Sequence, residues 1–526
     1  MGRPLATPIL IALLLGIGLR CWGLDHKLFW VDEIFTTLDI AGYTDGEMLA
    51  LFHPPRLTTA QGLIDTVALN DDRPFGAMLN SLITENTNHV PLYYSLTYGW
   101  VKLLGQSVTA LRALAMVCSL AALPLFYSLG RMLFNSRICA GLAVALMAVS
   151  PVHVLYSQEA RPYSLWMLMT VLSSWALVQA LTGHRLTGQL GHAPSRRWMA
   201  WALYGVTVSL GFYTHLYMPL VFVTHGLYVG FCYRWRWCPP VQRYLIASVA
   251  GVASFVPWLL AIAPYRHVLK ENAHWQLQAA SSDPLLLVYH LGLTLARGFI
   301  DFDLNYGFSP DHWWPYGVVI MAVAGLVAYC LILFSRYTPG SAWLLPVLLL
   351  LVPALGIVAI EVGLGQQQTG IPRYFTPCYV GAELVVAGAL GQQIEAGASR
   401  LWSLVAISLL AIGALSCGNS ALAETWWTKS GHYLPVVAEI INQSDRPFVV
   451  ADSDAWTFAL AYQLAPDTPM ALFNSDQITP LVPPGYSDYF LYNAPTDWVP
   501  EFQAASGYTV VPLEGLENVP LWRVIP

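Results

Sequence analysis

The sequence predicts an α-helical polytopic membrane protein that carries a small soluble α/β domain at its C-terminal end. Hydrophobic residues make up 56% of the 526 residues and charged residues only 11%, whereas soluble domains contain about 25% charged residues. Apolar runs of roughly 20 residues, the length that crosses a bilayer core, recur along the chain. Beyond about residue 418 the hydropathy falls and short helical and strand patterns follow. The net charge of −6 indicates no nucleic-acid partner.

Eleven membrane spans are expected from the apolar runs. The first run is too long for the apolar core of a signal peptide, and no cleavage pattern precedes Asp25, so we expect it to be retained as a span. The spans are placed at about 5–24, 109–130, 138–155, 162–182, 198–213, 217–232, 244–264, 313–334, 342–361, 374–393 and 401–418.

The loop charges predict the orientation of these spans. Loops on one side carry eleven arginines and a single acid, Glu395, and the positive-inside rule places that side in the cytoplasm. The N-terminus is therefore expected inside and the C-terminus outside. The resulting localisation is a multi-pass protein of the plasma (inner) membrane, with its polar residues of interest facing the periplasm or exterior.

The predicted domains are a transmembrane module over 1–418 and an extracytoplasmic α/β domain over 419–526. Within the module, residues 25–108 form a first external loop with juxtamembrane helices over 44–52, 70–80 and 89–105. In the C-terminal domain, alternating patterns predict a partly parallel sheet. Its helices are expected over 434–442 and 456–464, and its strands over 447–451, 469–473 and 489–492.

Two adjacent carboxylates, Asp32 and Glu33, lie where the first apolar segment ends. Carboxylates at a membrane span are costly to desolvate, which favours a functional interpretation. The alternative is a stop signal at the interface, with both acids facing water. In the functional interpretation, one carboxylate acts as a general base and the second orients it or binds a metal ion. Glu159, in the second external loop, is a third candidate acid.

Three arginines, Arg112, Arg161 and Arg373, lie at the outer ends of predicted spans. Each alone is compatible with a side chain that snorkels to the interface. Together with the acids they predict a site for an anionic leaving group. His89 and His215 are candidate ligands of a divalent metal ion, although hydrogen-bonded interface histidines fit the sequence equally well.

The order of these motifs resembles a known family, the bacterial polytopic glycosyltransferases of the GT-C fold, related to protein O-mannosyltransferases and to the aminoarabinose transferase of lipid A. The resemblance covers roughly residues 1–420. The matching motifs are Phe29-Trp30-Val31-Asp32-Glu33, His89-Val90-Pro91-Leu92-Tyr93-Tyr94, Ala110-Leu111-Arg112, Ser150-Pro151, Tyr156-Ser157-Gln158-Glu159-Ala160-Arg161-Pro162-Tyr163, Tyr213-Thr214-His215 and Arg373-Tyr374. His89-Val90-Pro91 departs from the His-Pro-Pro of the family.

The resemblance implies inverting transfer of a sugar from a polyprenyl-phosphate donor to an acceptor hydroxyl of a lipid, glycan or protein. It implies Asp32 as the general base, with Glu33 and Glu159 as further catalytic acids, and a possible metal ion held by Glu159 and His215. The expected substrate-binding residues are His89, Tyr93, Arg112, Gln158, Arg161, Arg297, Arg373 and Tyr374.

Two other classes of protein share some of these features. A transporter or flippase for a lipid-linked saccharide would also carry outer-face arginines, but such proteins place ionisable groups at the bilayer midplane and show paired repeats. Here Glu383 is the acid expected well inside a span. The second alternative is an inactive structural homologue, against which the intact acidic motifs speak.

Overall fold

The structure is a computed structural model, and it describes residues 3–50, 56–70, 72–185, 194–272, 283–302, 313–338, 340–397, 399–452, 454–473, 482–495, 497–513 and 519–525. The chain divides into two compact units. Unit 1 comprises residues 1–24, 86–93 and 112–422, and unit 2 comprises residues 25–85, 94–111 and 423–526. Each unit is described by itself.

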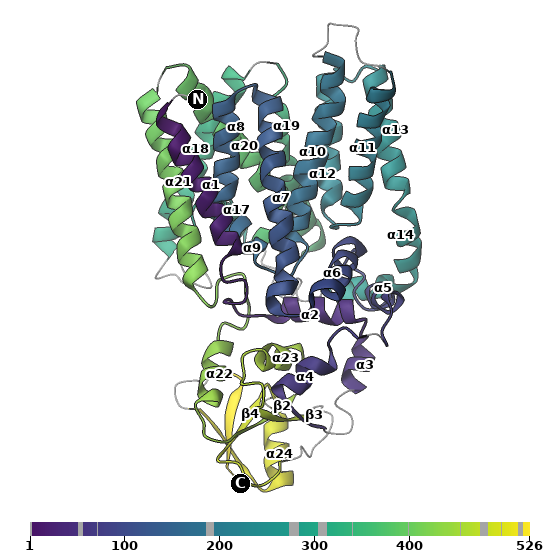
Figure 1. Cartoon of the computed structure of the whole chain (residues 1–526), viewed down its shortest axis with the longest axis vertical. Helices are drawn as coiled ribbons and strands as arrows, with labels where there is room; N and C mark the ends of the chain where they lie inside the picture. Colours follow the sequence, from purple (N-terminus) through teal and green to yellow (C-terminus); the bar gives the residue numbers. More distant parts are fainter. Residues whose placement is uncertain are drawn as a thin grey trace. The chain divides into compact units, whose positions relative to one another are not determined.

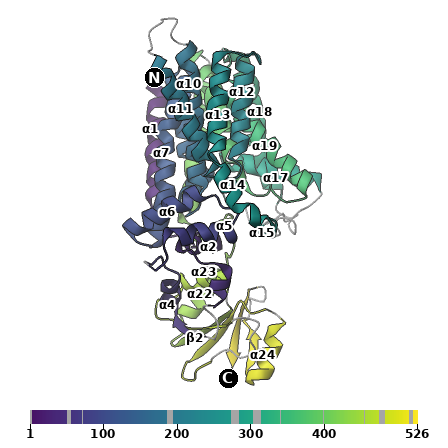
Figure 2. The same ribbon diagram turned by 90° about the vertical axis from the view of Figure 1, so that its right-hand side faces the viewer.

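Unit 1 is a bundle of long helices that run roughly side by side (Figures 1 and 2). Its elements are α1 (Arg3–Cys21), most of α7 (Val108–Phe134), α8 (Arg137–Ala148), α9 (Pro151–Ser157), α10 (Tyr163–Arg185), α11 (Pro194–Phe212), α12 (Met218–Cys232), α13 (Pro239–Ala253), α14 (Val256–Ile262), η1 (Ala263–Tyr265), α15 (Arg266–Glu271), α17 (Pro284–Arg297), α18 (Trp313–Tyr337), α19 (Leu344–Leu364), η2 (Pro372–Phe375), α20 (Thr376–Glu395) and α21 (Ser399–Leu422).

Each expected span coincides with one helix or with consecutive helices, as 138–155 does with α8 and α9 and 244–264 with α13, α14 and η1, which confirms the helical class. Six helical stretches among the described residues are long and apolar enough to cross a membrane, or seven if α8 and α9 count as one bent span. Helices α1, α11 and α12 are apolar but shorter. The count of eleven spans and their orientation therefore remain predictions. The six stretches are 108–134, 163–181, 239–271, 315–337, 344–364 and 400–422.

A sharp bend separates α8 from α9. The two helix axes differ by 54°, and Pro151 is the first residue of α9. A proline has no N–H to continue the hydrogen bonds of the preceding helix, so α8 ends before it. The bend places the loop that contains Gln158 and Glu159 directly after the short helix α9.

Unit 2 contains a six-stranded sheet with the order β1-β3-β2-β4-β6-β5. Strand β2 is parallel to β3 and to β4, which confirms the three expected strands and their parallel pairing. The elements of unit 2 are α2 (Val31–Ala41), α3 (Asp45–Ala50), β1 (Arg56–Thr59), α4 (Ala60–Thr66), α5 (Phe75–Thr84), most of α6 (Pro91–Leu104), α22 (Leu434–Asn442), β2 (Pro447–Asp452), α23 (Ala455–Ala461), β3 (Pro469–Phe473), β4 (Asp488–Tyr492), α24 (Trp498–Ser506), β5 (Thr509–Pro512) and β6 (Leu521–Ile525).

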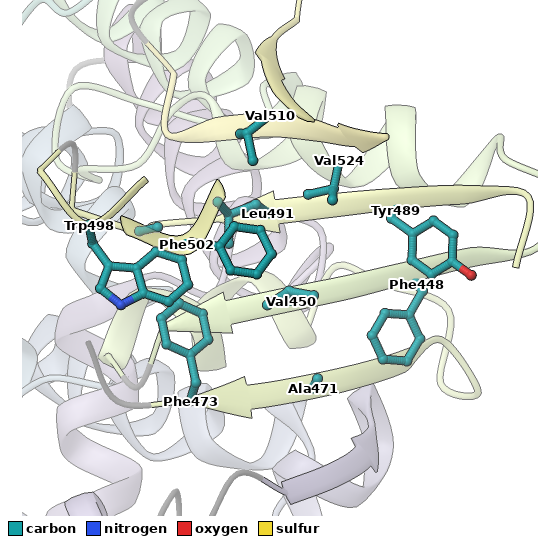
Figure 3. Packing of buried hydrophobic residues seen from close by; sticks show 11 residues of the cluster. Phe448, Val450, Ala471, Phe473, Tyr489, Leu491, Trp498, Phe502, Val510 and Val524 are labelled. Atoms are coloured by element: carbon teal, nitrogen blue, oxygen red, sulfur yellow. The ribbon is translucent and has the colours of Figure 1, made fainter. Parts of the chain in front are cut away.

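One face of this sheet carries an aromatic core (Figure 3). Alternate residues of a strand point to the same face, so Phe448 and Val450 of β2 lie together under α24. The ring centroid of Phe473 is 4.4 Å from that of Trp498, and Trp498 stacks on Phe502 at 5.0 Å. The resulting cluster is buried, so α24 and the sheet form one packed layer pair.

The first loop and the C-terminal tail belong to the same unit. Strand β1, from the first loop, pairs antiparallel with β3 of the tail. The sequence boundary at residue 418 was expected to separate a transmembrane module from a soluble domain. In the structure, contacts group residues 25–85 and 94–111 with residues 423–526, and the division at residue 418 stays a prediction. The expected loop helices correspond to α3, α5 and α6, and residues 51–52 lie outside the described part.

Candidate functional site

Glu33 is one half of a buried ion pair. Its Oε2 lies 3.1 Å from Nζ of Lys429, and neither side chain is exposed to solvent. The same ammonium lies 5.7 Å from the ring centroid of Trp30. A buried carboxylate is tolerated when it is paired and hydrogen-bonded. The structure therefore engages Glu33 with a cation that the sequence did not identify as a site residue.

Asp32 is placed differently from its neighbour. It lies in the first turn of α2 and is partly exposed, whereas Glu33 is fully buried. Successive residues of a helix point in directions about 100° apart, so one acid faces the interior while the other reaches the surface. Of these two adjacent acids, Asp32 is the one whose side chain is partly exposed.

The segment before α2 is fixed to the start of the tail. Nζ of Lys27 donates to the carbonyl of Ala423 at 2.9 Å, and the backbone N–H of Leu28 donates to the carbonyl of Glu424 at 2.9 Å. These contacts join residues that are almost 400 positions apart. They fasten the segment that leads to Asp32 to residues 423–424.

In unit 1, α1 and the α8–α9 bend cap each other. Arg20 donates to the carbonyls of Met147 and Ala148, the last residues of α8. In return, Nε2 of Gln158 donates to the carbonyls of Leu19 and Trp22 at 2.8 Å each. The last carbonyls of a helix lack intrahelical donors, so both helix ends gain partners. Gln158 was expected to bind substrate, but its amide nitrogen is used to hold α1.

This mutual capping requires close contact between the helices. A Cβ atom at Gly16 would lie 2.6 Å from the carbonyl carbon of Ala148, so only glycine fits at that position. Ser119 accepts a further hydrogen bond from Nε of Arg20 at 2.9 Å. Arg112, fully buried, donates to the carbonyl of Leu24 at 2.7 Å. Arg112 thus contributes at least one hydrogen bond to the segment that follows α1.

A group of predicted site residues meets in unit 1. Nη2 of Arg161 lies 3.2 Å from Nε2 of His89. A guanidinium group has no acceptor atom, so the imidazole accepts this hydrogen bond. The side chain of Arg373 lies over the rings of Tyr163 and Tyr374, at 5.6 and 5.9 Å from their centroids. Two arginines predicted to bind an anion are therefore placed by aromatic and imidazole neighbours.

His215 lies in the loop between α11 and α12. Its ring stacks on Trp166, with 3.7 Å between centroids and planes 5° apart. Its Nδ1 accepts from the backbone N–H of Tyr217 at 3.1 Å. Burial, followed by the nearby His89, Arg161 and Arg373, lowers the pKa of His215 to about 3. The ring is therefore neutral at neutral pH, with its proton on Nε2.

The expected metal ligands do not fit a cation in this arrangement. Zinc binds an imidazole through a nitrogen that carries no proton, and the free lone pair of His215 is already used by Tyr217. The charged side chains that act on His215 are cationic. Among the described residues, no three His, Cys, Asp or Glu side chains are grouped as metal ligands. We therefore derive no catalytic step through a metal ion.

The remaining predicted residues take different positions. Glu159 is fully buried between Gln158 and Arg161 in the chain. Tyr93, in the first turn of α6, is also fully buried. The ring of Tyr374 lies 5.1 Å from that of Tyr217, edge to face. Arg297 ends α17 and lines a small cavity with Asp301.

Comparison with known families finds a match over part of the chain. Residues 88–260 match the family described as dolichyl-phosphate-mannose-protein mannosyltransferase. The resemblance to polytopic glycosyltransferases is confirmed. The matched third of the chain contains His89, Glu159, Arg161 and His215. A comparison with curated protein sequences found no significant match.

Solved structures that resemble this chain include those of ArnT and AglB. ArnT from Cupriavidus metallidurans, bound to undecaprenyl phosphate, is 13% identical with a TM-score of 0.48, and the match covers 99% of this chain and 97% of that chain. The Archaeoglobus fulgidus oligosaccharyltransferase AglB, with an inhibitory peptide and a dolichol-phosphate, is 12% identical with a TM-score of 0.47. That match covers 88% of this chain and 64% of AglB. This chain thus spans less than two thirds of the archaeal protein.

Proposed function

We propose that this protein is a membrane glycosyltransferase that moves a sugar from a polyprenyl-phosphate-linked donor to an acceptor hydroxyl. The observation that carries the proposal is the family match over residues 88–260, because that segment contains Arg161 hydrogen-bonded to His89 and, close in space, a neutral His215. A lipid, glycan or protein can supply the acceptor hydroxyl.

In unit 1, arginine side chains are the proposed partners of the donor phosphate. Guanidinium groups bind phosphate oxygens with two parallel hydrogen bonds, and positive charge stabilises the phosphate as it leaves. Arg161 is 6% exposed and Arg373 is partly exposed. Both side chains are fixed by neighbours, so little ordering is needed when an anion binds. Arg112, Gln158, Tyr93, Arg297 and Tyr374 remain proposed substrate-binding residues.

In unit 2, Asp32 is the proposed general base. Its carboxylate takes the proton of the acceptor hydroxyl while that oxygen bonds to the anomeric carbon of the sugar. The bond from the anomeric carbon to the phosphate oxygen breaks, and polyprenyl phosphate leaves with the electron pair. One displacement inverts the anomeric carbon. Glu33 holds Lys429 in this proposal, and the buried Glu159 remains a second candidate acid.

The membrane arrangement completes the proposal. The N-terminus is cytoplasmic, and Asp32, Arg161 and His215 face the periplasm or exterior of the plasma membrane. Residues 1–418 contribute the membrane helices, and residues 419–526 contribute an extracytoplasmic domain joined to the first loop.

Turnover of the donor tests the function directly. Membranes containing the protein are incubated with polyprenyl-phosphate sugars isolated from the producing cells, and released polyprenyl phosphate is measured by mass spectrometry. The wild type is expected to release it only when an acceptor fraction is present. Asp32→Asn is expected to lower the rate by about 10²–10⁴, the usual contribution of a general base.

The control is Asp72→Asn, which changes an exposed acid of unit 2 outside α2. Its rate should equal that of the wild type. If the donor crosses the membrane chemically unchanged, the protein is a flippase and not a transferase. Normal release by Asp32→Asn would remove Asp32 as the base while leaving the transferase assignment intact.

A further inference from the structure

An apolar groove runs between α11 and α13, which lie side by side in both views (Figures 1 and 2). Its volume is about 390 Å³, within the range of about 300–1,000 Å³ typical of ligand pockets. Its lining includes Trp198, Trp201, Ala202, Arg243 and Ala250. The groove is therefore large enough to take part of a ligand.

Small residues create the groove. The backbones of the two helices touch, because a Cβ atom at Gly251 would lie 2.8 Å from the carbonyl oxygen of Gly205. Ala202 and Ala250 line the groove beside this contact and add little side-chain volume. Val206 is 53% exposed and Ile246 is 58% exposed. Ile246 lies on a stretch long and apolar enough to cross a membrane, and Val206 lies on the shorter apolar helix α11 beside it. Exposed apolar side chains on such helices suit contact with lipid rather than with water.

The two ends of the groove differ in chemistry. At one end, the guanidinium carbon of Arg243 lies 5.6 Å from the ring centroid of Trp198. Arginine and tryptophan are typical of the membrane–water interface. At the other end, the hydroxyls of Ser209 and Ser254 are hydrogen-bonded to each other at 2.6 Å. The cationic end is thus the end that suits a lipid headgroup.

A buried polar atom provides a second indication of a ligand. Trp201 lines the groove and is 1% exposed, and its indole N–H has no acceptor among the described residues. Buried indole N–H groups usually find a partner. Trp201 lies about one helical turn from Trp198 along α11, which puts this donor near the cationic end of the groove.

We propose that this groove binds an anionic phospholipid. One acyl chain lies along Ala202 and Ala250, an ester carbonyl accepts from the indole N–H of Trp201, and the phosphate binds Arg243. The site is separate from the candidate catalytic residues of unit 1, because Trp198 and Arg243 lie near the start of α11 and α13 whereas His215 follows the end of α11. The proposal does not depend on the glycosyltransferase function.

Native mass spectrometry of the full-length protein in detergent tests it. The probes are phosphatidylglycerol and phosphatidylcholine with identical acyl chains, and undecaprenyl phosphate as a competitor. Wild-type protein is expected to retain one phosphatidylglycerol in preference to phosphatidylcholine. Arg243→Gln should weaken that retention about tenfold, the effect of losing one charge-assisted contact. Ala202→Phe fills the groove and should abolish retention of both phospholipids.

Each variant has a matched control. Arg236→Gln removes an exposed cation from the loop before α13, and Val249→Phe adds a ring to an exposed position of α13 outside the groove lining. Both should retain phosphatidylglycerol as the wild type does. All four positions are at least partly exposed, and unchanged thermal unfolding confirms intact folding. Equal retention by Ala202→Phe and Val249→Phe would overturn the site. Displacement by undecaprenyl phosphate would overturn the assigned ligand.

Discussion

Replacing Lys429 by methionine should make helix α2 unfold locally more often. The change removes the ammonium that lies 3.1 Å from Glu33 and leaves a carboxylate with no exposed surface. Breaking a buried ion pair in this way costs about 3–5 kcal/mol, and the contact with the ring of Trp30 adds about 1 kcal/mol. The free energy of opening of α2 should fall by that amount, which is a large share of the stability of a typical domain.

Replacing both partners should restore the helix. In the variant that combines Glu33→Leu with Lys429→Met, two apolar side chains of similar size occupy the position of the ion pair. Such replacements are usually neutral or stabilising. The double variant should therefore lie within about 1 kcal/mol of the wild type, and the two single changes should be strongly non-additive.

Hydrogen exchange of the α2 amides measures this opening free energy for the whole protein. Donor turnover, measured on the same samples, separates the structural role of Glu33 from a chemical one. Exchange in Lys429→Met that equals the wild type would refute the buried pair. If the double variant shows normal hydrogen exchange but no donor turnover, Glu33 takes part in the reaction itself.

Three further changes test other parts of the structure. Arg20→Gln removes the guanidinium donors from the carbonyls at the end of α8, and each buried carbonyl that loses its donor costs about 1–3 kcal/mol of stability. The thermal unfolding midpoint should therefore fall. A midpoint equal to that of the wild type would contradict the capping role. His215 is unprotonated in the native state down to about pH 3, whereas its unfolded pKa is about 6.5. Below pH 6.5 the unfolded state binds a proton that the folded state does not, so the free energy of unfolding should fall as the pH is lowered towards 3. The free energy of unfolding of His215→Gln should fall less steeply over this range. Equal pH dependence of the wild type and His215→Gln would contradict the role of His215. Thr58→Pro should increase hydrogen exchange in β3. The backbone N–H of Ala60 donates to the carbonyl of Thr468, and in an antiparallel pair every second residue is hydrogen-bonded to its partner, so Thr58 is bonded as well. Proline has no N–H and removes that bond. Leu57→Pro, on the unbonded alternate position, should leave β3 protected.

Apolar periodicity predicted most of the helices because a long apolar run has few alternatives in a membrane protein. Strands β2, β3 and β4 were equally visible, since each is a short apolar run bounded by turn residues. Strand β1 was missed because Arg56–Thr59 is neither apolar nor β-rich enough by itself. Its conformation depends on β3, which lies more than 400 residues later in the chain.

The candidate site shows the same limit. The residue types and the order of the motifs singled out Arg161, His89 and His215, and the structure brings these three together. The partner of Glu33 could not be predicted, because nothing near Lys429 in the sequence marks it as buried. The role of Arg20 was hidden by its place at the end of an apolar run, where a cation is expected to reach the interface. Long-range contacts decided both roles.

The pairing of β1 with β3 has a consequence for biosynthesis. Chains fold from the N-terminus as they are made, yet Asp32 and Glu33 are synthesised long before Lys429 and β3. Until about residue 473 has been produced, α2 lacks its buried cation and β1 lacks its neighbour. Contacts of such high sequence separation form slowly. The helix that carries the proposed base is therefore among the last parts of the protein to be completed, after the membrane helices between the two segments have been synthesised.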